Sequence, residues 1–344
     1  MPELGSTTRS MDSSFQELFA HLSQVERDPE HTHLNNDILR DAQNNLSSTT
    51  PRDVVWSILS TGERLLDIIQ EDPRPLTRLL EVDISFIPFD EIRDSIPLEK
   101  LIQGLLSPSL PIQVLCLAYL RKAADSPSGV AWVGSTASLV NVLVTTWLTS
   151  DSTEVAERAL ETLIILLEVD HVGRTSLIRE GGLTGKAQGQ GLLWRRLFRD
   201  REIYSLFFQW TSFKNLTSRE TTKQDMRKIT TSQGRLFDFI ARVAGLDWSN
   251  ITRSHFPDVE SRYADQQTLE GSGGISLLQY AASFMVDSND ALMSILRGDF
   301  FMKLLAIIDE GSGKLEVPPK LLEAMREDIG GITENSSQSG GVRL

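Results

Sequence analysis

Two histidines close together in the sequence, His31 and His33, are the first residues whose types suggest chemistry. Asp28 and Glu30 lie beside them, and imidazole with carboxylate is a ligand set that holds zinc in many proteins. A pair spaced i, i+2 in a loop is not a defined ligand spacing, however, and no cysteine or further histidine joins it. We therefore interpret the segment as a solvated loop and expect no metal site.

Two further short sequences contain residue types found in enzymes. The stretch Gly182–Ala187 has glycines and a lysine, as a phosphate-binding loop does, but it lacks that loop's spacing and the Ser or Thr after Lys186. Asp170 and His171 suit a hydrolase site by type, yet no nucleophile elbow accompanies them. The sequence thus indicates no catalytic residue and no cofactor, and we expect that the protein is not an enzyme.

The charge of the chain is unevenly distributed. The 344 residues carry a net charge of −13, but Arg174–Arg242 holds 14 Lys/Arg and six Asp/Glu, a net +8 that leaves −21 elsewhere. A strongly negative chain argues against general nucleic-acid binding, which depends on neutralising phosphates. A local basic surface remains compatible with this total.

Arginines and aromatic residues alternate within the basic region, from Trp194 to Arg201. An amphipathic helix there would bury its large apolar side chains, Leu193, Leu197 and Phe198. Its arginines would then face solvent: Arg195, Arg196 and Arg199. Beside this structural interpretation stand two functional ones, contact with an acidic protein partner and contact with nucleic acid.

Carboxylates recur on one broad face of the helix expected from Thr153 to Val169. They are Glu154, Glu157, Glu161 and Glu168. This is either a solvated face or a surface for basic side chains, and in a helical-repeat protein the exposed inner helices are often where partners dock. We therefore place candidate partner-binding residues at Glu157, Arg158 and Glu161, beside Arg195, Arg196 and Arg199 of the basic segment.

The composition is that of a folded protein, with 40% hydrophobic and 24% charged residues. The single cysteine, Cys116, lies among apolar residues, so we expect a buried structural thiol and no disulfide within the chain. The N-terminal residues lack the basic and apolar regions of a secretory signal, and no apolar run reaches the roughly 18 residues that span a bilayer. We expect a cytoplasmic protein, in the nucleus as well or instead, that does not contact membranes.

A repeat organises the chain from Pro97 to Leu183. Two helices separated by a short break at Pro108–Pro111 are followed, 43 residues later, by two more helices around a break at Ser150–Ser152. The aligned positions include Leu101 with Val144, Leu105 with Leu148, Ser107 with Ser150, and Leu117 with Leu160. Helix pairs with a period of roughly 40–47 residues are typical of HEAT and armadillo proteins, whose repeats stack to share one core. The sequence predicts an all-α, HEAT/armadillo-like helical-repeat solenoid without a sheet.

Around the repeats, the sequence predicts several further segments. We expect a disordered N-terminus over 1–10, a solenoid over 11–329 and a disordered tail over 330–344. A capping helix is expected at Met11–Val25, and one helix at Leu192–Trp210. Two polar insertions, 214–234 and 247–274, contain few apolar side chains and are predicted to be long loops. The residues after Asp170, closed by Gly181 and Gly182, are expected to form a short helix that turns into the next repeat.

Three stretches resemble one family of helical-repeat proteins. They run from Ile96 to Leu117, from His171 to Gly181 and from Ser283 to Phe301. They are similar to the HEAT/armadillo proteasome chaperones known as 26S proteasome non-ATPase regulatory subunit 5, some fungal relatives of which are labelled DNA mismatch-repair proteins. The resemblance implies a cradle that binds the C-terminal domain of one ATPase subunit while the base of the regulatory particle assembles, and then departs.

Two classes of function follow from these observations. The first is a non-enzymatic assembly chaperone, monomeric by itself, whose partner is a proteasomal ATPase subunit. The second is a DNA-repair or nucleic-acid adaptor that uses the basic segment 195–201. A general protein-binding scaffold shares the same fold and forms a further alternative.

Overall fold

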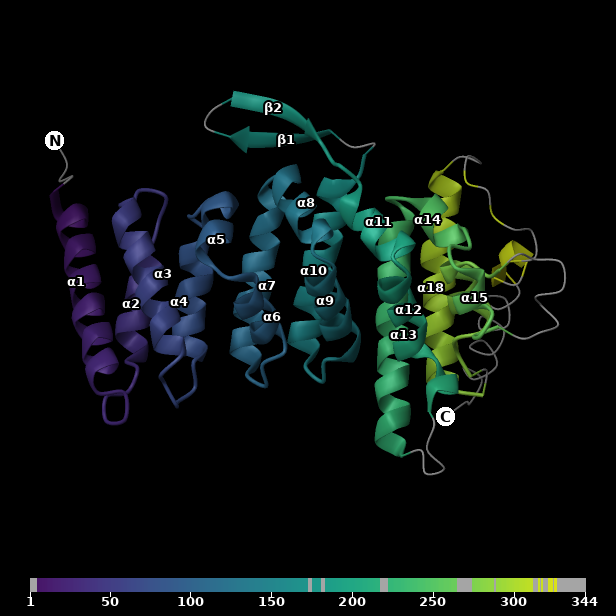
Figure 1. Cartoon of the computed structure of the whole chain (residues 1–344), viewed down its shortest axis with the longest axis horizontal. Coiled ribbons are helices and arrows are strands. Elements are labelled where there is room, and N and C mark those ends of the chain that lie inside the picture. Colours follow the sequence, from purple (N-terminus) through teal and green to yellow (C-terminus); the bar gives the residue numbers. More distant parts are fainter. Residues whose placement is uncertain are drawn as a thin grey trace, which may run out of the picture. The chain divides into compact units, whose positions relative to one another are not determined.

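The structure is a computed structural model that describes residues 5–172, 175–180, 183–216, 222–264, 274–287, 289–311, 315, 317, 321–323, 325 and 326. These residues form a succession of packed helices and one two-stranded hairpin (Figure 1). The predicted all-α, HEAT/armadillo-like helical-repeat fold is confirmed, although the hairpin was not expected. The tail that we expect to be disordered, 330–344, lies outside the described residues.

Two compact units divide the chain. Unit 1 comprises Met1–Val142 with Gly173–Gln190, and unit 2 comprises Leu143–Val172 with Gly191–Leu344. The boundary at Val142 falls inside helix α9 (Ala137–Thr149). Each unit is described below by itself.

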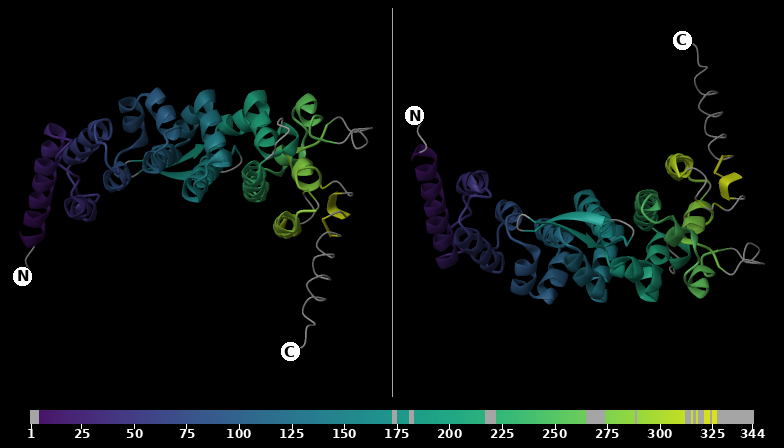
Figure 2. Two further views of the ribbon diagram at one scale, coloured as in Figure 1. Left: turned by 90° about the horizontal axis from the view of Figure 1, so that it is seen from below. Right: turned by 90° about the horizontal axis from the view of Figure 1, so that it is seen from above.

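Unit 1 is built from helices that follow one another in sequence order, as both views of Figure 2 show from the purple end of the chain. They are α1 (Gly5–Arg27), α2 (Asn36–Asn45), α3 (Arg52–Leu66), α4 (Arg74–Ile84), α5 (Phe89–Ser95), α6 (Leu98–Leu105), α7 (Leu110–Lys122), the 3-10 helix η1 (Ala123–Asp125) and α8 (Pro127–Ser135). Helix α1 packs on α2 and α3, and α4 packs on α2, α3 and α7. Each helix buries one apolar face against its neighbours, which is how a helical-repeat protein forms its core.

The first helix confirms the expected capping helix but begins earlier than expected. Phe15, Leu18 and Leu22 are buried, and α1 extends back to Gly5. The prediction of disorder over 1–10 is therefore wrong for residues 5–10, while residues 1–4 lie outside the described part of the chain. The physical reason is cooperativity: once packed residues nucleate a helix, each further polar residue adds a hydrogen bond at little cost.

The 43-residue repeat is confirmed at the level of individual turns. Helix α7 begins at Leu110 and α10 (Thr153–Asp170) begins 43 residues later. The Ser107 hydroxyl accepts a hydrogen bond from the N–H of Ser109 at 3.1 Å, and the equivalent Ser150 hydroxyl accepts one from Ser152 at 3.2 Å. The aligned Leu117 and Leu160 are both buried, as predicted. The two repeats thus share their turn geometry as well as their apolar positions.

A β-hairpin replaces the short helix that we expected after Asp170. Strands β1 (Thr175–Glu180) and β2 (Leu183–Gln188) pair antiparallel, with Glu180 opposite Leu183. Only Gly181 and Gly182 separate these paired residues, and Gly-Gly between two short runs is a hairpin signal. The prediction of a short helix after Asp170 is therefore wrong for residues 175–180 and 183–188, which form the two strands.

Unit 2 contains α10, α11 (Leu192–Arg199), α12 (Arg201–Thr211), the 3-10 helix η2 (Phe213–Asn215), α13 (Lys223–Ala244), α14 (Trp248–Thr252), α15 (Pro257–Glu260), α17 (Leu277–Ser283) and α18 (Ala291–Glu310). The single helix predicted over Leu192–Trp210 is in fact two. Asp200 lies between them with an extended backbone, and its carboxylate accepts hydrogen bonds from the N–H groups of Glu202 and Ile203. An aspartate that caps a new helix ends the previous one.

The two polar insertions are also largely helical. Thr222 and Asp225 form a capping box that starts α13, so the prediction of a loop over 214–234 is wrong from residue 222 onward. In 247–274, α14 buries Trp248 and Ile251 and α15 buries Val259, which contradicts a purely polar connection. Residues 217–221 and 265–273 lie outside the described residues. These segments are helical despite their polar composition, because capping residues start α13 and α14 and a few apolar side chains pack against neighbouring helices.

Aromatic side chains form the centre of unit 2. Ring centroids of Trp147 and Phe239 lie 5.0 Å apart, those of Phe207 and Phe239 lie 5.6 Å apart, and those of Phe208 and Tyr280 lie 4.6 Å apart. These distances fall in the range in which aromatic pairs stabilise beyond the area they bury. The cluster joins α9, α12, α13 and α17, and so fixes the surface that α13 presents to its neighbours.

Within the described part of the chain, no single helix is both long and apolar enough to cross a bilayer. Taken as a pair, α8 and α9 meet the length and composition, but the chain bends by 90° between them.

Candidate functional site

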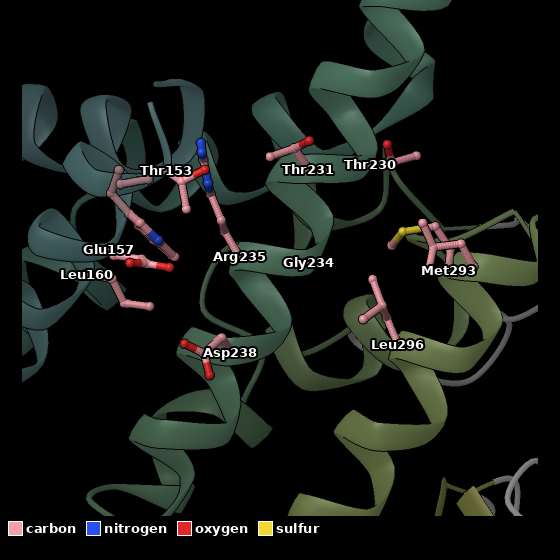
Figure 3. A pocket seen from close by; sticks show the side chains of 13 residues that line it. Thr153, Glu157, Leu160, Thr230, Thr231, Gly234, Arg235, Asp238, Met293 and Leu296 are labelled. Atoms are coloured by element: carbon pink, nitrogen blue, oxygen red, sulfur yellow. The ribbon is translucent and has the colours of Figure 1, made fainter. Parts of the chain in front are cut away.

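A pocket of about 370 Å³ opens over helix α13 in unit 2. Residues of α10 line one side and residues of α18 line the other, with Gly234 of α13 on the stretch between them (Figure 3). Its apolar lining includes Trp147, Leu160 and Met293. The pocket is thus assembled from helices far apart in the sequence, with an apolar floor of the kind that ligand and peptide sites share.

Arg235 fixes one wall of this pocket. Its guanidinium donates hydrogen bonds to the carbonyl oxygens of Leu148 at 2.9 Å and Ser150 at 2.8 Å, at the C-terminal end of α9. A cation is favourable there because the last carbonyls of a helix carry partial negative charge. Burial lowers the pKa of Arg235, and the nearby carboxylates of Asp151 and Glu157 act in the opposite direction. The contacts hold α13 in position against the end of α9.

Two buried side chains on α13 add to this attachment. The Ser232 hydroxyl donates to the Leu148 carbonyl at 2.8 Å, and the Gln233 amide donates to the carbonyls of Thr211 and Met285 at 2.8 and 2.6 Å. Hydrogen bonds buried in this way fix the rotation of the helix about its axis. The residues that follow, Gly234 and Arg235, are therefore presented to the pocket in a defined orientation.

A second pocket, of about 630 Å³, lies over the first turns of α13 and shares Arg235 with the first. Its charged lining consists of four cations and one carboxylate: Lys223, Arg227, Lys228, Arg235 and Asp151. The positive potential of such a concave surface exceeds that of the same charges spread on a convex one. In a chain whose net charge is −13, this pocket is a local basic site.

Helix α18 has large apolar side chains on its exposed side. The exposed fractions are 65% for Leu292, 54% for Ile295, 37% for Leu296 and 51% for Met302. The opposite side of the helix is buried, with Phe300 and Leu304 packed inside unit 2. Of the exposed residues, Leu292 and Leu296 line the first pocket. Leu292, Ile295 and Leu296 follow the i, i+3, i+4 spacing of one helix face, and apolar residues grouped in this way mark an interaction site more often than scattered ones do.

The candidate residues on α10 fall partly within the site. Glu157 lines the first pocket. Arg158 and Glu161 are exposed on the same helix, and Arg158 forms an ion pair with Glu154 at 3.6 Å. Neither of these two is among the described residues that line the pocket.

The candidate arginines on α11 lie elsewhere. Leu193, Leu197 and Phe198 are buried, as predicted for an amphipathic helix. Arg195 and Arg199 are exposed, whereas Arg196 is 28% exposed and pairs with Asp200 at 2.7 Å. The prediction that all three face solvent is therefore wrong for Arg196.

The basic segment 195–201 is further neutralised at its end. Arg201 forms an ion pair with Asp258, which lowers the pKa of that carboxyl through the hydrogen bond from the arginine. Neither pocket over α13 has a described lining residue from this segment. The structure therefore does not bring the two groups of candidate residues, on α10 and on α11, into one site.

Sequence reasoning missed the residues of α13 and α18 that complete the site. The missed residues are Lys223, Arg227, Lys228, Gly234, Arg235, Leu292 and Leu296. Two signals were present in the sequence: the Thr222–Asp225 capping box, which starts α13, and the high content of leucine, isoleucine and phenylalanine in α18. A helix with more large apolar side chains than one face can hold exposes some of them.

The other residues considered for chemistry have structural surroundings. His31 pairs with Asp28 at 2.8 Å and His33 with Glu71 at 3.4 Å, both on the surface. Among the described residues no group of three or more His, Cys, Asp or Glu side chains is placed to hold a metal. The side chain of Lys186, in β2, lies outside the described part of the structure. Burial raises the pKa of the Cys116 thiol to about 12, and an un-ionised thiol is a poor nucleophile.

Asp170 closes the base of the segment that contains the hairpin. Its carboxylate accepts hydrogen bonds from the N–H groups of Leu193 at 2.7 Å and Trp194 at 3.1 Å, and its carbonyl accepts one from Gly191. Burial raises the pKa of Asp170, while the backbone N–H donors act against this shift. The residue caps α11 from the end of α10, which is a structural role.

Comparison of the chain with protein-family models and with curated proteins found no match.

Proposed function

We propose that the protein is a non-enzymatic binding scaffold that acts as an assembly chaperone for the base of the proteasome regulatory particle. In this proposal it holds the C-terminal domain of one ATPase subunit before that subunit is incorporated, in the cytoplasm or nucleus, and binds as a monomer. The resemblance of three stretches of the sequence to proteasome chaperones supplies the identity of the partner.

One structural observation supports a binding role most strongly. The pocket over α13 combines an apolar floor, charged residues at its rim and exposed leucines on α18, and it contains Glu157, a residue placed at an interface by sequence reasoning alone. Protein interfaces have this anatomy, with an apolar centre inside a polar rim. The helical-repeat fold is consistent with this role, because such proteins offer extended surfaces to partners.

The first experiment is a pull-down of the full chain from cell extract, followed by mass spectrometry. Enrichment of proteasomal ATPase subunits without core-particle subunits supports the proposal. Purified C-terminal domains of the ATPase subunits then serve in direct binding measurements. We expect one of them to bind, and binding to weaken as salt rises, because charged rim contacts are screened beyond about 8 Å at physiological ionic strength.

Charge-reversal variants locate the contact. Glu157→Lys is expected to weaken binding through a faster dissociation, since Glu157 lines the pocket. Arg195→Glu with Arg199→Glu is expected to slow association, since both side chains are exposed. Tight binding of duplex DNA at physiological salt, with no affinity for any proteasomal ATPase, would instead favour a nucleic-acid adaptor.

A further inference from the structure

The two pockets over α13 adjoin one another. Both are lined by Thr153, Thr231 and Arg235. We name the combined surface the α13 groove. It runs from the exposed leucines of α18, across Gly234, to the first turns of α13.

Gly234 keeps the apolar half of the groove open. It lies in the interior of a 22-residue helix, where glycine is less favourable than alanine. A Cβ added at Gly234 would meet only one side-chain atom within 4 Å, the Cδ1 of Leu296 at 3.9 Å. Packing inside the protein therefore does not require glycine at this position. What a larger side chain would obstruct is the groove itself (Figure 3).

The floor of the apolar half also has an unused hydrogen-bond donor. Trp147 is fully buried and lines the pocket, and its indole Nε1–H has no hydrogen-bond partner among the described residues. A buried donor without a partner is uncommon in folded proteins. The donor is closed to solvent, so an occupant is inferred from the apolar lining and the charges of the groove.

The basic half of the groove defines the charge of the occupant. Lys223 and Arg227 form no ion pair with any described residue, and Lys228 is influenced by Asp225 on its own helix. Asp151 is the only carboxylate among the described lining residues of this half. The groove thus has an excess of positive charge at one end and none at the other, where Glu157 and Asp238 lie at the rim.

We propose that the α13 groove binds an acidic–apolar segment of a partner protein, with the acidic residues of the segment over the first turns of α13 and its large apolar side chains against Leu292 and Leu296. The difference in charge between the two ends gives the segment a single direction. This inference rests on the proposed function for the identity of the partner protein. The chemistry of the bound segment follows from the groove alone.

The test uses the full chain and fluorescein-labelled model peptides, with fluorescence anisotropy as the readout. One peptide has a run of glutamates followed by leucine and phenylalanine at helical i, i+3 and i+4 spacing; in the second, every glutamate is replaced by lysine. We expect the acidic peptide to bind at least about tenfold more tightly than the basic one, and its affinity to fall as salt rises.

Variants at Gly234 then distinguish an effect on peptide binding from an effect on folding. Gly234→Leu fills the groove and is expected to weaken the acidic peptide about tenfold or more, while Gly234→Ala, the matched control, retains binding within about twofold. Both are expected to melt at or above the wild-type temperature, because both residues favour a helix over glycine. Arg227→Glu with Lys228→Glu is expected to reverse the preference between the two peptides.

Several outcomes would overturn the inference. Equal affinity for the two peptides would refute the conclusion that the groove selects acidic residues. Unchanged peptide affinity in a folded Gly234→Leu variant would refute the conclusion that the peptide binds in the groove. Self-association that Gly234→Leu abolishes would assign the groove to a second copy of this chain. If wild type and Gly234→Leu capture an ATPase equally well, the proposed function stands, and only the proposal that the groove binds the partner segment is refuted. Peptide binding that meets all expectations, without capture of an ATPase, supports the groove and refutes the identity of the partner.

Discussion

Asp83 gives the sharpest test of how the structure relates to stability. The residue lies in α4, its side chain is fully buried, and neither carboxylate oxygen has a hydrogen-bond partner among the described residues. Burial raises the pKa of Asp83 to about 8, from 3.8 in an exposed chain. Between these two values the folded protein holds a proton that the unfolded chain releases. The free energy of unfolding therefore falls as pH rises through this window.

The magnitude follows from the shift. Each pH unit between 3.8 and about 8 costs about 1.4 kcal/mol of stability at this site, or roughly 4 kcal/mol at pH 7 relative to an unburied carboxyl. Asp83→Asn removes the ionisable group and keeps its shape. We expect the variant to be more stable than wild type at pH 7, and its advantage to grow by about 3 kcal/mol from pH 5 to pH 7.

The assay is urea denaturation at pH 5, 6 and 7, followed by far-UV circular dichroism, for wild type and Asp83→Asn. The same substitution at an exposed position, Asp41→Asn, is the matched control. A stability difference between wild type and Asp83→Asn that does not change with pH would show that the Asp83 carboxyl ionises normally in the folded protein. The reasoning from its burial would then be refuted.

Three further predictions test the packing. Leu117→Asp places a carboxylate in the repeat core, at a cost of several kcal/mol, and is expected to abolish soluble folding, while Leu106→Asp, at a site 62% exposed, folds like wild type by circular dichroism. Gly104→Ala adds a Cβ that overlaps the Cys116 sulfur and is expected to lower stability by about 1–3 kcal/mol in urea denaturation, with recovery in the double variant Gly104→Ala, Cys116→Ala. Asp170→Ala removes the acceptor for two N–H groups at the start of α11 and is expected to cost about 1–2 kcal/mol, whereas Asp170→Asn retains most of the wild-type stability; equal losses would contradict the capping role.

The repeats were predictable because local signals and the apolar pattern agree there. Ser107 and Ser150 occupy equivalent turns, and Leu117 and Leu160 equivalent core positions, so a shift of the sequence against itself places both. Each signal depends only on residues a few positions apart. Where pattern and capping support the same structure, a single sequence suffices.

Helix α13 and the hairpin were missed because each segment contains two sequence signals that predict different structures. The polar composition before Leu236 suggested a loop, although the Thr222–Asp225 capping box was present and the buried face of the helix begins only at Ser232. At Gly181 and Gly182 a helix end and a hairpin turn are both good uses of glycine. The structure pairs β1 with β2. Such pairing depends on contacts between two separate segments, which the local sequence around the glycines does not reveal.

The α13 groove shows why a site of this kind escapes inspection of the sequence. Glu157, Arg235 and Leu296 meet around it from helices separated by more than fifty residues of chain, and none of the three has an unusual sequence context. The informative residue is Gly234, since it lies inside a continuous helix in which alanine would be about 1 kcal/mol more favourable and would find room. A glycine that neither the backbone nor the packing requires indicates that the space beside it is used. Because the groove adjoins exposed leucines on one side and a cluster of four cations on the other, we propose that an acidic and apolar segment of another protein uses it.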